Sequence, residues 1–85
     1  MITAFVHISA DPATIAPLGR ALAGIDGIAE VYSVTGDDDL LAIVRVNDHE
    51  RVARIVTEHI GALDGVLATR TSIAFRQYDP TDVSF

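Results

Sequence analysis

The order in which hydrophobic periodicities follow one another constrains this chain more than any other feature. Apolar residues recur at every second position in four stretches and at helical spacing in two others. Period two is typical of strands, and spacings of three and four residues are typical of amphipathic helices. The expected elements are, in chain order, a strand over 2–9, a helix over 12–25, a strand over 28–35, a strand over 40–46, a helix over 49–63 and a strand over 66–78.

This β-α-β-β-α-β order predicts an α+β, ferredoxin-like fold with a four-stranded antiparallel sheet. The short acidic segment Gly36–Asp39 is expected to join two antiparallel strands as a hairpin. Both crossovers take the same sense, so both helices should cover one sheet face. The other face would carry Phe5 and His7 and stay open in a monomer. An open face of this kind favours face-to-face packing of two sheets, which predicts a dimeric α/β sandwich.

Local signals predict where the helices begin. Asp11 is expected to cap the first helix, Pro12 suits its first position, and Pro17 predicts a bend or a 3₁₀ start nearby. Asn47–Asp48 is expected to cap the second helix. The apolar face of that helix is expected to consist of Val52, Ile55, Val56, His59, Ile60 and Leu63.

Composition narrows the range of partners. The chain has 85 residues, enough for one small domain with a small core. It has no Cys, so no disulfide can stabilise that core, and we expect association with another copy of the chain to do so. The net charge of −6, with six Arg and no Lys, argues against binding nucleic acid or an anionic membrane. No basic leader and no apolar run of the ~20 residues that a membrane span needs is visible. Cytoplasm is therefore the expected location.

Two segments resemble a known family. The run from Val31 to Leu41, V-Y-S-V-T-G-D-D-D-L-L, and the run from Gly65 to Ile73, G-V-L-A-T-R-T-S-I, are similar in order and spacing to the effector-binding (RAM) domain of the Lrp/AsnC, or feast/famine, transcription regulators. The resemblance covers residues 2–78 as a single domain, and 79–85 are expected to form a C-terminal tail. This chain departs from the family pattern at Asp64, where the family has Pro, and at Asp38 and Leu40, where it often has aromatic residues.

The resemblance implies a function as well as a fold. Family members usually carry an N-terminal helix-turn-helix domain, and this sequence begins at the first strand of the effector domain, so it resembles the stand-alone RAM proteins. The implied role is a non-catalytic module that binds an amino acid or similar small metabolite between subunits. The implied partners are a second copy in a homodimer, with tetramers or octamers as open alternatives, and full-length Lrp/AsnC regulators. Direct contact with nucleic acid or membrane is not expected.

The resemblance also implies where the ligand binds. Asp39 matches the family Asp and is expected to pair with a ligand ammonium group, while Gly36 would let backbone N–H groups approach a ligand carboxylate. The residues of this first wall are Thr35, Gly36, Asp37, Asp38 and Asp39. The second wall, from a neighbouring subunit, is expected near His59, Leu63, Thr71 and Ser72.

Several alternatives remain open at the level of sequence. The acidic turn can be an ordinary solvated hairpin, and His59 an ordinary helix residue at the edge of the core. An ACT-type regulatory module has the same topology but would need Gly in the turn at Ser9–Pro12, where there is none. A small dimeric α/β-barrel enzyme of the monooxygenase kind would have only His7 and Tyr32 to work with. No catalytic residue, metal site or cofactor is therefore predicted.

Overall fold

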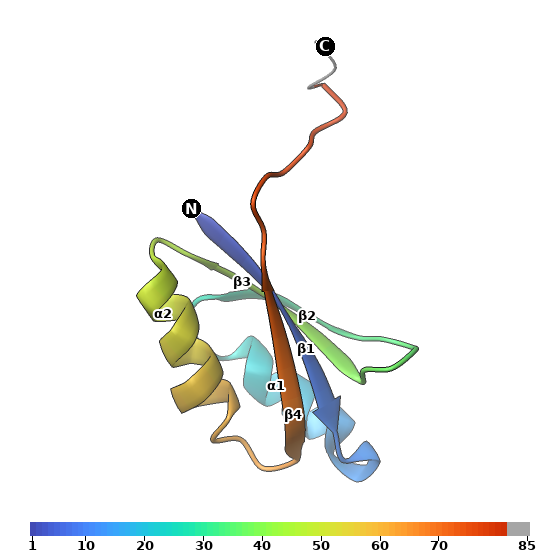
Figure 1. Cartoon of the computed structure of the whole chain (residues 1–85). Helices are drawn as coiled ribbons and strands as arrows, with labels where there is room; N and C mark the ends of the chain where they lie inside the picture. Colours follow the sequence, from blue (N-terminus) through green and yellow to red (C-terminus); the bar gives the residue numbers. More distant parts are fainter. Residues whose placement is uncertain (82–85) are drawn as a thin grey trace.

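Four antiparallel strands form one sheet in the order β2-β3-β1-β4, in a computed structural model that describes residues 1–81. Both helical segments lie against the same face of this sheet, so the predicted ferredoxin-like fold is confirmed (Figure 1). The elements are β1 (Ile2–Ala10), η1 (Pro12–Thr14), α1 (Ile15–Ala23), β2 (Ile28–Ser33), β3 (Leu40–Val46), α2 (His49–Arg54), η2 (Ile55–Ile60) and β4 (Val66–Ile73).

Strand β1 lies at the centre and carries the core. Its inward residues Ala4, Val6 and Ile8 are 0% exposed. They face residues of β3 on one side and β4 on the other, with Val6 opposite both Ala42 and Thr71. The helices supply the opposing layer of the core, namely Leu18, Leu22, Val52, Ile55 and Ile60. The alternation at period two in the sequence therefore separates core from open face as predicted.

The first helix starts as its sequence signals predict. The Asp11 carboxylate accepts a hydrogen bond from the Ala13 amide at 3.1 Å, and a 3₁₀ turn, η1, precedes α1. Pro17 falls in the first turn of α1, where amides have no intrahelical partner, so its missing N–H costs little.

The second helix differs from the expectation of one regular helix over 49–63. It is α-helical only to Arg54, and η2 is a π-helix in which the Gly61 amide donates to the Val56 carbonyl at 2.9 Å. The five-residue step directs both Ile55 and Ile60 into the core. His59 is exposed and Leu63 lies beyond the helix, so the prediction that His59 belongs to the apolar face was wrong.

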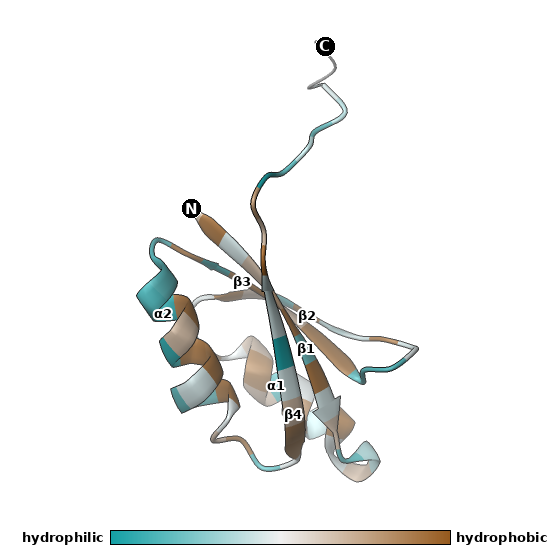
Figure 2. Ribbon diagram, viewed as in Figure 1, coloured by the Kyte–Doolittle hydropathy of each residue, from teal (hydrophilic) through white to brown (hydrophobic). Residues whose placement is uncertain are grey.

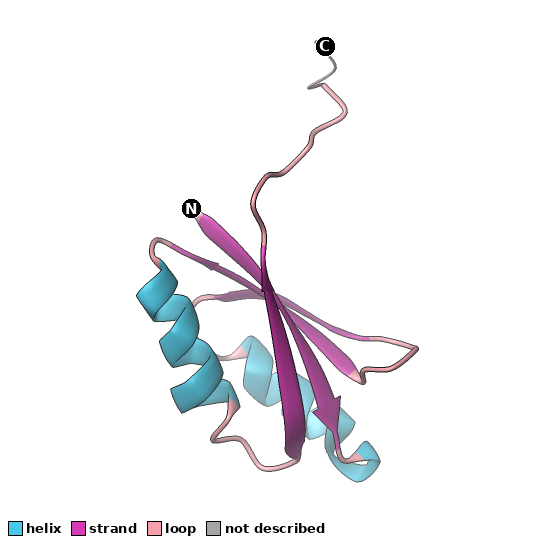
Figure 3. Ribbon diagram, in the orientation of Figure 1, coloured by secondary structure: helices cyan, strands magenta, loops and turns pink. Residues whose placement is uncertain are grey.

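The last strand is shorter than predicted. Strand β4 ends at Ile73 instead of Tyr78, and the chain continues as a loop (Figure 3). Ala74 donates a final bond to the Thr3 carbonyl, so the pairing of β4 with β1 ends close to the start of β1. The predicted strand over 28–35 likewise ends at Ser33. The boundary at residue 78 stays a prediction, and 82–85 of the predicted tail lie outside the described residues.

The sheet face away from the helices is apolar in the middle and polar at its margins. Phe5 of β1 lies opposite Ile43 of β3, and His7 lies opposite Leu41, and all four are half-buried. The Arg45–Glu30 ion pair, 3.3 Å between Nη1 and Oε1, lies toward the β2 margin. We call this surface, comprising Phe5, His7, Leu41, Ile43 and their neighbours, the open face.

Two glycines with similar positive φ angles provide a test of how closely the chain packs around them. Gly65 has φ +98°, and an added Cβ would overlap the Thr14 hydroxyl and lie 2.9 Å from Thr14 Cβ. Gly36 has φ +109° with nothing within 4 Å. We expect Gly36→Ala to cost about 1–2 kcal/mol of unfolding free energy through backbone strain alone. Gly65→Ala should cost about 1–3 kcal/mol more through the clash. Urea unfolding of both variants measures the difference, and equal losses would contradict the close approach at Gly65.

Candidate functional site

A six-residue loop, 34–39, joins β2 to β3 and carries the three consecutive aspartates. The Val34 amide donates to the Asp39 carbonyl at 3.0 Å and closes the loop at its base. Gly36 adopts its positive φ in open space at the exposed tip. In Figure 2 the loop segment that leads into β3 is teal, so hydrophilic residues lie directly before a brown, hydrophobic strand. We call residues 34–39 the acidic loop.

The carboxylate of Asp39 is directed inward, to the end of β1. Its Oδ2 accepts a hydrogen bond from the Ala10 amide at 2.8 Å, and the Asp39 amide donates to the Ile8 carbonyl at 2.9 Å. Asp39 is half-buried as a result. The residue expected to pair with a ligand ammonium group is therefore already bonded to the protein's own backbone.

The neighbouring carboxylate, Asp38, lies over the end of the open face. Its Oδ2 accepts a hydrogen bond from Arg70 Nη2 at 2.9 Å and lies 3.2 Å from His7 Nδ1. The side chain of Asp38 is only 17% exposed, whereas that of Arg70 is 68% exposed. Arg70 of β4 is brought here because it pairs directly with His7 of β1.

A hollow of about 250 Å³ forms where the acidic loop meets the open face. Its lining combines carboxylates, a guanidinium and an imidazole with a hydroxyl and two apolar side chains. The lining residues are His7, Val34, Thr35, Asp37, Asp38, Leu41 and Arg70. Because groups of both charge signs stand beside apolar surface, the hollow suits a small molecule that carries both charges.

The second predicted wall lies elsewhere in the subunit. His59 lines a different hollow, of about 470 Å³, between the end of α1 and the α2–η2 helix. Leu63 is half-buried in the turn after η2, and Thr71 and Ser72 follow Arg70 along β4. Within one subunit, the structure thus brings Thr35, Asp37 and Asp38 together in one hollow and leaves His59 in another.

Sequence reasoning missed four members of the hollow, namely Val34, Leu41 and the two basic residues His7 and Arg70. His7 was expected to be an interface residue, and Arg70 attracted no attention. Both depend on the β1–β4 register, which places position 70 opposite position 7. The only signal in the sequence was the presence of one basic residue in a strand of apolar and small polar residues.

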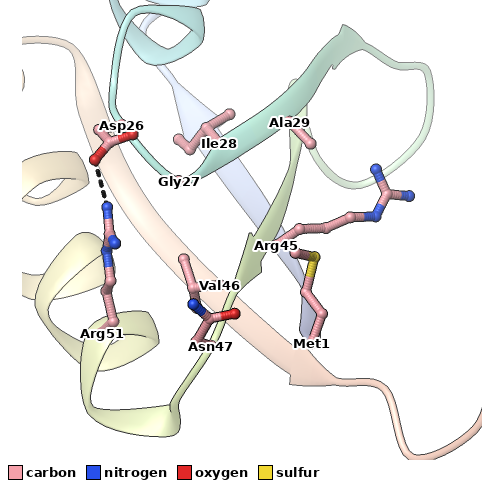
Figure 4. Close-up of a pocket in the computed structure, with 9 residues that line it drawn as sticks. All are labelled: Met1, Asp26, Gly27, Ile28, Ala29, Arg45, Val46, Asn47 and Arg51. Carbon is pink, nitrogen blue, oxygen red and sulfur yellow. Dashed lines mark hydrogen bonds and ion pairs between the residues drawn. The ribbon is translucent and has the colours of Figure 1, made fainter.

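A further hollow, of about 310 Å³, opens at the opposite end of β2 (Figure 4). Two guanidinium groups line it, but Arg51 is paired with Asp26 and Arg45 with Glu30. The Tyr32 hydroxyl donates a hydrogen bond to Glu30, and this bond, with Arg45 beside it, lowers the pKa of the Glu30 carboxyl. These are surface ion pairs, and none of their residues lines the hollow at the acidic loop.

Two further observations concern residues 1–81 alone. In this part of the chain, no three His, Asp or Glu side chains gather closely enough to hold a metal ion. None of the helices described here has the length and apolar character to cross a bilayer.

The sheet order and the helices on one face define an α+β domain of the ferredoxin-like class. Residues 3–83 match the Lrp/AsnC ligand binding domain, and the chain belongs to this family.

Three relatives show how close the likeness is. A protein of Thermus thermophilus, known from its crystal structure, is 48% identical, with a TM-score of 0.89 over 93% of this chain and 99% of that one. The feast or famine regulatory protein of M. tuberculosis, solved in complex with L-methionine, is 26% identical, with a TM-score of 0.75 over 100% of this chain and 56% of that one.

Among curated relatives, an uncharacterized HTH-type transcriptional regulator of Pyrococcus horikoshii is 37% identical over 76 residues, or 86% of this chain. The match covers 51% of that regulator, so this chain spans about half the length of the curated relative. The Pyrococcus horikoshii relative is named as a transcriptional regulator, and residues 3–83 of this chain match the family's ligand-binding domain.

The Asp38–Arg70 pair can be tested by a double-mutant cycle of Asp38→Asn and Arg70→Gln. Because Arg70 is largely exposed, we expect a coupling energy of about 0.2–1 kcal/mol that shrinks at high salt. Urea unfolding at low and high salt measures it. The control cycle, Asp37→Asn with Arg70→Gln, should show no coupling energy. If its coupling energy equals that of the Asp38 cycle, Arg70 interacts with the charge of the loop in general and not with Asp38 in particular.

Proposed function

We propose that this domain binds an amino acid or a similar small metabolite between subunits and acts as a non-catalytic sensing and oligomerisation module for transcription regulators of its family. The observation that carries the proposal is the geometry of the acidic loop. Asp38 and Asp39 hold the loop against β1 and the open face, and Thr35, Gly36 and Asp37 remain exposed at its tip. A loop held at its base and open at its tip can receive a ligand.

The chemistry of the loop matches an α-amino acid. Asp37 and Asp38 offer negative charge to an ammonium group, and the backbone N–H groups around Gly36 and the Arg70 guanidinium can receive a carboxylate. The M. tuberculosis relative in complex with L-methionine supports this ligand class. We propose the loop Thr35–Asp39 as the first wall, with Asp39 at its base holding the residues before it in place. The proposed second wall, from a neighbouring subunit, is His59, Leu63, Thr71 and Ser72.

A site shared between subunits requires assembly. The apolar middle of the open face, with Phe5, Leu41 and Ile43, is the surface we propose for the dimer, in which two sheets pack face to face. Further association of dimers would bring the acidic loop of one subunit near the η2–β4 region of another. The regulatory output would then lie with full-length regulators of the family, with which this domain co-assembles.

Ligand binding is tested by thermal unfolding with a panel of L-amino acids that starts with L-methionine. A ligand at one hundred times its Kd should stabilise the native state by about 2.7 kcal/mol, so Tm should rise by several degrees. D-Methionine carries the same charged groups with the opposite configuration at Cα and serves as the control. If no member of the panel raises Tm, amino-acid binding is wrong for this domain.

Dimerisation through the open face is tested by Phe5→Asp. Placing a carboxylate in an apolar interface leaves it desolvated and unpaired, so the variant should dissociate at micromolar concentration. Ala53→Asp adds the same charge at an exposed position of α2 and should leave the assembly unchanged. Sedimentation velocity distinguishes the two, and a monomeric wild-type protein would refute the proposal directly.

A further inference from the structure

Asp39 is the residue that the sequence marks as the ligand's partner, and its contacts indicate a different role. We propose that Asp39 is a positioning residue: its carboxylate holds the acidic loop on the end of β1 by accepting the Ala10 hydrogen bond, and it does not contact the ligand. The inference rests on the proposed function for the identity of the site, but the hydrogen bond itself can be tested without a ligand.

The Ala10 amide needs an acceptor that the sheet does not supply. Ala10 is 3% exposed, so an unpaired amide there would be costly. The ladder between β1 and β3 ends at the pair Ile8–Leu40, and the chain before Leu40 turns away as the acidic loop. The β1–β4 register also shifts between Ser9 and Ala10. The Asp39 carboxylate stands where a backbone carbonyl of a longer ladder would be.

Three hydrogen bonds tie Asp39 to other parts of its own subunit. Its amide donates to Ile8, its carbonyl accepts from Val34, and its Oδ2 accepts from Ala10. Asp37 and Asp38 line the hollow at the open face, whereas Asp39 does not. The three consecutive carboxylates therefore divide into one that holds the loop from beneath and two that face the hollow.

The anchor extends to the start of β4. Asp11, the next residue after Ala10, donates its amide to the Gly65 carbonyl at 2.9 Å, directly before Val66 begins β4. The hydrogen bond between the Ala10 amide and the Asp39 carboxylate thus ties the acidic loop to the place where β1 ends and β4 starts. Loss of the bond should let the loop shift relative to the strand that carries Arg70.

Comparing Asp39→Asn with Asp39→Ala shows whether the Asp39 side chain acts as a hydrogen-bond acceptor for Ala10 or through its negative charge. The Asn side-chain oxygen can still accept from Ala10 but carries no charge, and Ala can do neither. We expect amide hydrogen exchange of Ala10 to stay within about threefold of wild type in Asp39→Asn and to accelerate by about ten- to a hundredfold in Asp39→Ala. Asp37→Asn, a change at the exposed tip, should leave this amide unchanged.

Calorimetric titration with L-methionine, or with the panel member that raises Tm most, provides the second readout. Asp39→Asn should bind within about threefold of wild type, and Asp39→Ala at least tenfold more weakly because its loop is released. Equal losses in both variants, with Ala10 still protected in Asp39→Asn, would show that the ligand contacts the Asp39 charge and would overturn the proposal.

The two failures can be told apart. If wild type binds no amino acid, the proposed function fails, and the exchange rates still decide the anchoring role. Unchanged Ala10 exchange in Asp39→Ala would refute that role. If Asp39→Ala does not fold, Asp39→Asn decides: the proposal requires it to keep both Ala10 protection and affinity, and loss of either contradicts it.

Discussion

The whole structure depends on the backbone of β1 being paired along both edges while one of its faces is buried. Strands β3 and β4 flank it on either side, and Ala4, Val6 and Ile8 project into the core that the helices close. A central strand cannot leave amides unpaired at its end, because they are buried with it. At Ala10 the pairing is completed by the Asp39 carboxylate, so the same requirement that builds the core also fixes the acidic loop.

Three adjacent carboxylates would repel one another if they pointed the same way. The structure separates them, with Asp39 on the Ala10 amide, Asp38 on Arg70 and His7, and Asp37 exposed. Each of the first two is stabilised by donors that offset its charge. The division leaves a well-held loop with an open tip, which is the arrangement that the proposed sensing role requires. It also suggests that assembly and ligand binding are linked, because Asp38 touches residues of the open face.

Comparison with expectation shows where sequence patterns are reliable. Alternation along 2–9 predicted the first strand and its two faces, since burial of one side leaves a strong signature, and the Leu, Ile and Val content of 40–46 predicted the third strand. The end of β4 was missed because Phe75 continues the alternation of β4 past Ile73, where the pairing with β1 ends. The position of His59 was missed because its hydrogen bonds run five residues back along a π-helix, whereas the prediction assumed the four-residue spacing of an α-helix. The helix propensities of these residues do not distinguish the two kinds of helix.

By itself, the sequence determined the order of elements, the core faces of the strands, the cap at Asp11 and the location of an acidic turn with Gly36 at its tip. These depend on local periodicity and local hydrogen bonding, which act over a few residues. Tertiary structure alone decided that position 70 meets position 7, that Asp38 is paired with Arg70, and that Asp39 faces Ala10. Those contacts join residues about thirty or more positions apart through strand register, and register is set by the packing of the whole sheet rather than by any one segment.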